Sequence, residues 1–145
     1  MVYGCFQTVF FIVVLLPFGL SIKGGVAGVL TMAVGGTILA LAVGALMSAM
    51  AIKTGSSEAV QGAFPLLFIA MFFSSAFFPK ETMSGMYKTL AYVNPISYLV
   101  EGFRDLTIDG FSASAVVRAV VIPAVLALFA VGLALWALRS RLGAR

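Results

Sequence analysis

Long apolar runs alternate with short polar breaks along this chain of 145 residues. A bilayer core about 30 Å thick is spanned by about 20 apolar residues in a helix. Four runs are long enough for this, and none of them contains a charged residue. The pattern therefore predicts four transmembrane helices, at about residues 2–20, 26–50, 59–78 and 119–138.

Residues 80–118, between the third and fourth runs, follow a different pattern. They hold four of the five acidic residues and four of the nine basic residues of the chain. Asn94 and Pro95 have the order of a helix N-cap and a first helical position. Apolar residues recur on both sides of this point at helical spacing. They are Met83, Met86, Tyr87, Leu90 and Val93, then Ile96, Leu99, Val100, Phe103 and Leu106. The spacing predicts two short helices within about 82–109.

Each of these two helices has about ten residues, which is too short to cross a bilayer. We expect the pair to lie at the membrane surface, or to enter the membrane and return, with Tyr87, Tyr92 and Tyr98 at the interface. The predicted fold is an all-α integral membrane protein of one domain, residues 1–145. It has about four transmembrane helices and a re-entrant or interfacial helix pair before the last one.

The second run carries a small-residue ladder at every fourth position: Gly36, Ala40, Gly44 and Ser48. This spacing places the four residues on one helix face, where small side chains let another helix approach closely. We interpret the ladder as a helix-packing face; the alternative is the ordinary abundance of Gly and Ala in membrane spans. The partner helix could belong to the same chain or to another one.

A polar turn, residues 53–62, separates the second and third runs. Ser56 and its neighbours are suited to cap a short helix that begins near Glu58. We interpret the turn as a structural connector; a contact for a cytoplasmic partner is the alternative.

Composition agrees with a membrane location. The chain is 62% hydrophobic and 10% charged, whereas about a quarter of the residues in soluble domains are charged. No basic cluster is interleaved with aromatic residues, so nucleic-acid binding is not expected. Arg139, Arg141 and Arg145 directly follow the last run, which favours a cytoplasmic C-terminus next to anionic lipid. Four crossings would place both ends of the chain on that side.

The sequence lacks the residues of familiar catalytic and cofactor sites. It has no histidine and one cysteine, Cys5, which excludes histidine-based triads and ordinary zinc sites. Lys53-Thr54 lacks the preceding glycines of a phosphate-binding loop, so ATP would not bind by that route. We predict no enzymatic activity, no catalytic residues, no cofactor and no metal.

Charged residues on the second short helix could pair with one another. Arg104 follows Glu101 by three residues and directly precedes Asp105. Residues three apart on a helix are neighbours on its surface. We expect Arg104 to form a structural or gating ion pair there; the alternative is a solvated charged face.

One set of motifs resembles a known family. The segment Phe73-Ser74-Ser75-Ala76-Phe77-Phe78-Pro79 is followed after about fifteen residues by Asn94-Pro95-Ile96-Ser97-Tyr98, and then by Glu101 and Arg104. This order resembles the permease subunits of type-2 ATP-binding-cassette exporters, including daunorubicin-type and other multidrug or antibiotic exporters. The sequence departs from the family pattern at Ser75, where glycine is usual, and at Ser84, where a second proline is common.

The resemblance implies a specific place and function for the chain. It matches the C-terminal half of a six-span permease, which would make this chain spans three to six and a truncated or partial protein. The abrupt start in an apolar run, without a basic flank, favours the same expectation. By resemblance, two permease units work with two ATP-binding subunits in the plasma membrane and export drugs, antibiotics or other amphiphiles. The re-entrant gate motif would comprise Pro79, Asn94, Pro95, Tyr98, Glu101 and Arg104.

Two other functions fit the sequence less well. One is a small membrane scaffold or assembly protein without transport activity. The other is a fragment of a secondary transporter, which usually needs an ionisable residue near the membrane midplane. None of the four apolar runs has such a residue. A neighbouring gene for an ATP-binding subunit would distinguish a transporter from a scaffold.

Overall fold

The computed structural model describes residues 2–19 and 21–142, which are mostly helical and contain no strand. Leu20, at the end of the predicted first span, and Arg145, of the basic C-terminus, lie outside the described residues. The α-helices are α1 (Val2–Leu15), α2 (Gly25–Thr54), α3 (Ser57–Gly62), α4 (Phe64–Phe72), α5 (Gly85–Val93), α6 (Pro95–Ile108), α7 (Ala113–Val116) and α8 (Ile122–Leu142). The 3₁₀-helices are η1 (Leu16–Phe18) and η2 (Lys80–Thr82), and η3 (Val117–Val121) is a π-helical segment.

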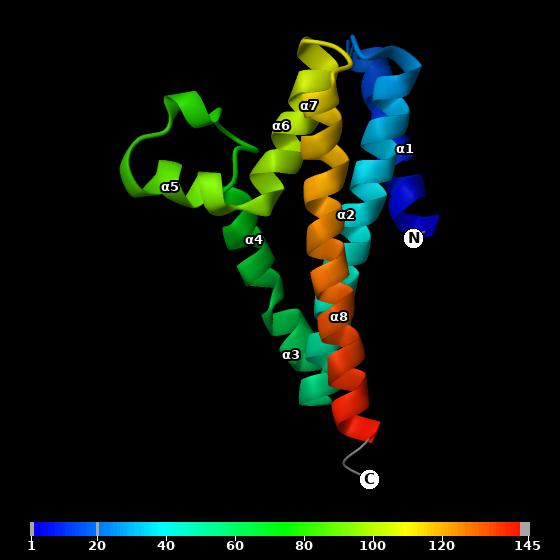
Figure 1. Ribbon diagram of the computed structural model, residues 1–145, viewed down its shortest axis with the longest axis vertical. Helices are drawn as coiled ribbons and strands as arrows, with labels where there is room; N and C mark the ends of the chain where they lie inside the picture. The colour runs from blue at the N-terminus through cyan, green and yellow to red at the C-terminus, as the bar shows by residue number, and fades with distance from the viewer. Residues whose placement is uncertain (1, 20, 143–145) are drawn as a thin grey trace.

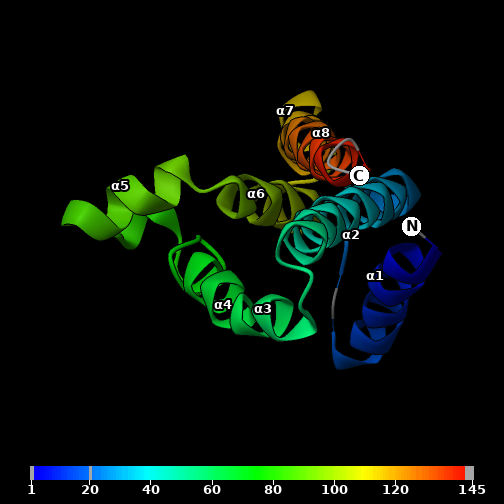
Figure 2. The same cartoon turned by 90° about the horizontal axis from the view of Figure 1, so that it is seen from below.

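Two helices are long and apolar enough to cross a membrane. They are α2 and the continuous helix Ala113–Leu142, formed by α7, η3 and α8, with 30 residues each. They lie side by side and run in the same direction (Figures 1 and 2). Large apolar side chains are exposed on both, including Val26 and Leu128. The long helices contain the predicted spans 26–50 and 119–138, so helical conformation is confirmed there.

The first and third predicted spans fold as shorter apolar helices, Tyr3–Leu15 and Ser57–Phe72. Ser56 caps the second of them, as predicted, by accepting a hydrogen bond from the amide of Ala59. That helix is divided at Ala63. Pro65 lies just after the division and has no amide hydrogen for the helical ladder. The prediction of helix to residue 78 was wrong, because the helix ends at Phe72 and the chain turns.

Helices α2, α6 and the last long helix meet around Ala119, which is fully buried. A Cβ atom added at Gly35 of α2 would lie 2.3 Å from the carbonyl oxygen of Ala119. One added at Gly102 of α6 would lie 2.6 Å from the Ala119 amide nitrogen. Pro123, four residues after Ala119, cannot donate to that carbonyl. Backbone therefore packs directly on backbone here, and only glycine fits at either position.

The small-residue ladder divides into two parts. Gly36 faces Thr8 of α1, since an added Cβ would lie 2.3 Å from the Thr8 hydroxyl. Ala40 likewise lies against Gly4 of α1. Gly44 has open space around its Cβ position, and Ser48 is exposed. Helix α1 thus contacts one half of the ladder, and the packing role of Gly44 and Ser48 stays a prediction.

The crossing at Ala119 predicts a sharp difference between two glycines. Gly35→Ala should destabilise the fold by about 1–3 kcal/mol, because the new methyl group overpacks the backbone of Ala119. Gly132→Ala is the matched control, since no atom lies within 4 Å of its Cβ position. The control should be neutral or stabilising by up to about 1 kcal/mol. Unfolding in mild detergent measures both, and equal stability of the two variants would contradict the close approach.

Candidate functional site

The candidate site lies where the segment between α4 and α5, residues 73–84, packs against α6. This segment, called the turn segment below, contains only the short helix η2 and otherwise turns and bends. Helix α5 lies across the long axis of the molecule, and α6 rises from it to the end at which α2 begins (Figure 1). The turn segment therefore presents non-helical backbone to α6, and its polar groups need partners.

Two serines provide the most deeply buried contact between the turn segment and α6. Ser75 and Ser97 both have no exposed surface. The Ser75 amide donates to Ser97 Oγ at 3.1 Å, and Ser75 Oγ donates to the Ser97 carbonyl oxygen at 3.1 Å. The backbone amide and the hydroxyl group of Ser75 thus both bind Ser97, one to its side chain and one to its backbone. These bonds satisfy polar atoms that water cannot reach. Ser75 stands where the family that the sequence resembles usually has glycine, and its hydroxyl makes one of these two bonds.

A buried ion pair connects the turn segment to α6 one helical turn after Ser97. Lys80 Nζ lies 3.1 Å from Glu101 Oε2, and the two side chains are 5% and 17% exposed. The ammonium group also lies 4.1 Å from the ring centroid of Tyr98 and 4.8 Å from that of Tyr92. Aromatic faces attract cations, most strongly where water is excluded. Lys80 therefore has favourable contacts on several sides despite its burial.

Asn94 and Pro95 occupy the predicted positions at the start of α6. Asn94 Oδ1 accepts a hydrogen bond from the Ile96 amide at 2.9 Å, and Pro95 is the first helical residue. The Asn94 amide group also donates to the carbonyl oxygen of Ala70 in α4. This second bond ties the corner between α5 and α6 to the preceding apolar helix, a role that capping alone does not require.

The predicted partner of Arg104 was wrong. Arg104 Nη2 donates to the Ser75 carbonyl oxygen at 2.9 Å, while Glu101 pairs with Lys80. Asp105 pairs with Arg118 of η3, at 3.0 Å. The reason is that the turn segment covers this face of α6, so long-range partners replace the neighbours on the helix.

The gate-motif residues do not all enter the contact in the same way. Glu101 and Arg104 bind the turn segment directly, and Tyr98 lies against Lys80. Pro79 is exposed and precedes η2, where its carbonyl oxygen accepts hydrogen bonds from the amide and hydroxyl of Thr82. Sequence reasoning missed the pairing of Ser75 with Ser97 and of Lys80 with Glu101. The signal for Ser97 was available, because Ser97, Glu101 and Arg104 recur at i, i+4 and i+7.

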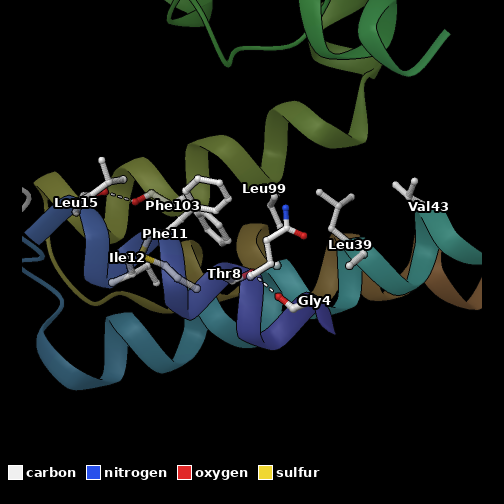
Figure 3. A pocket seen from close by; sticks show the side chains of 14 residues that line it. Gly4, Thr8, Phe11, Ile12, Leu15, Leu39, Val43, Leu99 and Phe103 are labelled. Carbon is white, nitrogen blue, oxygen red and sulfur yellow. Dashed lines mark hydrogen bonds between the residues drawn. The ribbon is translucent and has the colours of Figure 1, made fainter. Parts of the chain in front are cut away.

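A second feature is a cavity of about 550 Å³ between α1, α2 and α6. Figure 3 shows Phe11 and Ile12 of α1 on one side of it and Leu99 and Phe103 of α6 on another. The volume is within the range of small-molecule sites, which are mostly apolar with a few polar groups. The polar side chains at its wall are Gln7, Thr8 and Thr107.

Within residues 2–19 and 21–142, no group of acidic or cysteine side chains is suited to hold a metal.

These features define a helical membrane protein in which a buried polar contact fixes a non-helical segment inside an apolar frame. The family model for ABC-2 type transporters matches residues 1–108, and the chain belongs to this family. No curated protein and no solved structure matches the chain significantly. Membership makes the chain a membrane permease component of an ABC transporter, which associates with an ATP-binding subunit and is not itself the catalytic subunit.

The buried ion pair predicts a specific pattern of stabilities. Glu101→Leu should cost about 3–5 kcal/mol, because the Lys80 charge would stay buried without its partner. The double variant Lys80→Met, Glu101→Leu should recover most of that loss, since an apolar pair needs no desolvation of charge. Glu81→Leu, at an exposed position in η2, is the control.

Unfolding in mild detergent should therefore rank the double variant well above the Glu101→Leu single variant. A single variant as stable as the wild type would show that Lys80 is hydrated and not buried.

Proposed function

We propose that the chain is the membrane-spanning permease component of an ATP-driven exporter that moves drugs, antibiotics or other amphiphiles out of the cell. Family membership is the observation that carries this proposal. The cavity between α1, α2 and α6 supports the choice of amphiphiles, because its wall is apolar and has a few polar groups. The two short helices α5 and α6, which come before the last long helix, support a re-entrant pair and a place in the C-terminal part of a type-2 permease.

In this proposal the chain crosses the plasma membrane four times. Helices α1 and α3–α4 are the crossings besides α2 and the last long helix. The parallel direction of α2 and α8 requires the intervening chain to return across the membrane, and α3, α4 and α6 lead back toward the start of α2 (Figure 1). Arg139 and Arg141 follow the apolar part of α8, which supports a cytoplasmic C-terminus.

The topology is tested by cysteine labelling in intact cells, in a Cys5→Ser background. An impermeant thiol reagent should label Lys88→Cys in α5, because the re-entrant pair opens to the outer side. It should not reach Arg141→Cys. Labelling at Arg141→Cys with protection at Lys88→Cys would reverse the proposed orientation.

The contact between the turn segment and α6 is proposed to act as an outer gate. ATP binding would close two ATP-binding subunits and move the helices of two permease subunits, and the gate would open toward the outside. The buried bonds at Ser75 and Lys80 support this role, because a segment fixed by a few discrete contacts has two defined arrangements, bound and released. An assembly scaffold without transport would need no such arrangement.

Arg104→Ala in the assembled transporter tests the gate. The substitution removes a donor to the Ser75 carbonyl oxygen but leaves the serine pair and the buried ion pair in place. Membrane level should stay near that of the wild type, while ATP-dependent export falls at least several-fold. Lys88→Ala, on the neighbouring helix α5, is the control and should keep both. Normal export by Arg104→Ala at normal level would exclude a gating role.

A further inference from the structure

The cavity between α1, α2 and α6 opens along one edge of α1. Gln7, Phe11 and Leu15 line it at four-residue spacing, so their side chains form one stripe on that helix. All three are exposed, Phe11 at 54% and Leu15 at 46%. Gly4 and Thr8, which also line the cavity, contact α2 instead. The stripe is therefore the mouth of the cavity, and in the proposed topology this mouth faces the hydrocarbon of the bilayer.

Gln7 brings an amide group to this mouth that its own helix does not use. The Thr8 hydroxyl donates to the Gly4 carbonyl oxygen at 2.9 Å, and the Thr107 hydroxyl donates to the Phe103 carbonyl oxygen. In the described part of the chain, no residue forms a hydrogen bond with the Gln7 side-chain amide. A polar group in hydrocarbon costs free energy until it finds a partner. Gln7 thus offers two donor hydrogens and an acceptor oxygen to whatever fills the cavity.

The side chains that line the cavity carry no charge. Glu101 and Asp105, the acidic residues within α6, are paired with Lys80 and Arg118. Asp109 follows the last turn of α6 and is exposed, outside the cavity wall. A cationic or anionic ligand would lose its hydration in this cavity without gaining a counter-charge. The wall therefore fits an uncharged ligand.

A lipid acyl chain and a neutral ligand with a polar group are the two kinds of uncharged occupant. An acyl chain would cover the apolar wall but would leave the Gln7 amide without a hydrogen bond. Phe11 and Phe103 lie on different sides of the cavity and offer ring contacts to an aromatic ligand (Figure 3). A neutral aromatic ligand with a carbonyl or amide group matches both parts of the wall.

We propose that the cavity binds neutral aromatic amphiphiles, which enter from the lipid between the side chains of the mouth, and that Gln7 selects them by hydrogen bonding to a carbonyl or amide group. The assignment of this substrate class rests on the proposed export function. Binding itself needs no ATP, so it can be measured apart from export.

Three photoreactive probes of one shape test the ligand class. Each is a phenyl diazirine, with a carboxamide, a methyl or a trimethylammonium group in the para position. The assembled transporter is labelled in lipid nanodiscs without ATP, and labelled residues are mapped by peptide mass spectrometry. Label on the cavity wall is divided by label on Leu128 of α8, which is 74% exposed, to correct for unequal partition into lipid. The carboxamide probe should exceed the methyl probe by about two- to tenfold, as one net hydrogen bond allows. The trimethylammonium probe should give the lowest ratio.

Gln7→Leu keeps the size of the side chain and removes its amide. The carboxamide probe should then label the cavity no better than the methyl probe. Unchanged labelling by the methyl probe shows that the cavity is still formed in this variant. Gln61→Leu, at an exposed position in α3, is the matched control and should keep the preference of the wild type.

Equal ratios for the carboxamide and methyl probes in the wild type would overturn the proposal in favour of an acyl-chain site. A preference that survives Gln7→Leu would exclude Gln7 as the selecting residue. A highest ratio for the trimethylammonium probe would assign the cavity to cations. Any of these results, in a transporter that still exports drugs, would leave the proposed export function standing. Selective labelling in a transporter that exports nothing would confirm the site and contradict export.

Discussion

Non-helical backbone inside an apolar protein needs hydrogen-bond partners for its amide and carbonyl groups. The rest of this structure depends on the partners that α6 provides to the turn segment. The turn segment leaves the helical ladder after Phe72. Its amide, carbonyl and ammonium groups then bind Ser97, Arg104 and Glu101 on one face of α6. Without these partners, each buried polar group would cost free energy on the order of a lost hydrogen bond or more. The bonds therefore decide where the segment lies and which way α5 leaves it.

The same helix connects the site to the membrane frame. Gly102 follows Glu101 directly and packs on the backbone of Ala119, and Gly35 of α2 packs on Ala119 from another side. Closely packed backbones do not deform gradually, because no side chain can adjust between them. A shift of the last long helix would therefore move α6 with it and act on the contacts of Glu101 and Arg104. This is a physical route from the helices to the proposed gate.

Local rules predicted the helices well and their partners poorly. The apolar length of α2 and the Asn94-Pro95 start of α6 are properties of neighbouring residues, and both were predicted. The end of α4 was missed because Ser75 is bound by Ser97 of a helix more than twenty residues away, which no local hydropathy shows. The partner of Arg104 was missed for the same reason. The small-residue ladder predicted a packing face that includes Gly36. The neighbouring Gly35, which is outside the ladder, makes the close approach to the last long helix, because α2 is packed on more than one face.

Disulfide trapping in the assembled transporter tests most directly whether the turn segment is fastened to α6. Ser75→Cys and Ser97→Cys are combined in a Cys5→Ser background, which leaves no other thiol in this sequence. The serines exchange two hydrogen bonds of 3.1 Å, which brings the two positions close, so a membrane-permeant oxidant should join the new thiols when the buried contact opens transiently. ATP-dependent export should stop on oxidation and return after reduction. Full export by the cross-linked protein would contradict the account, because the contact between the turn segment and α6 would then not need to open.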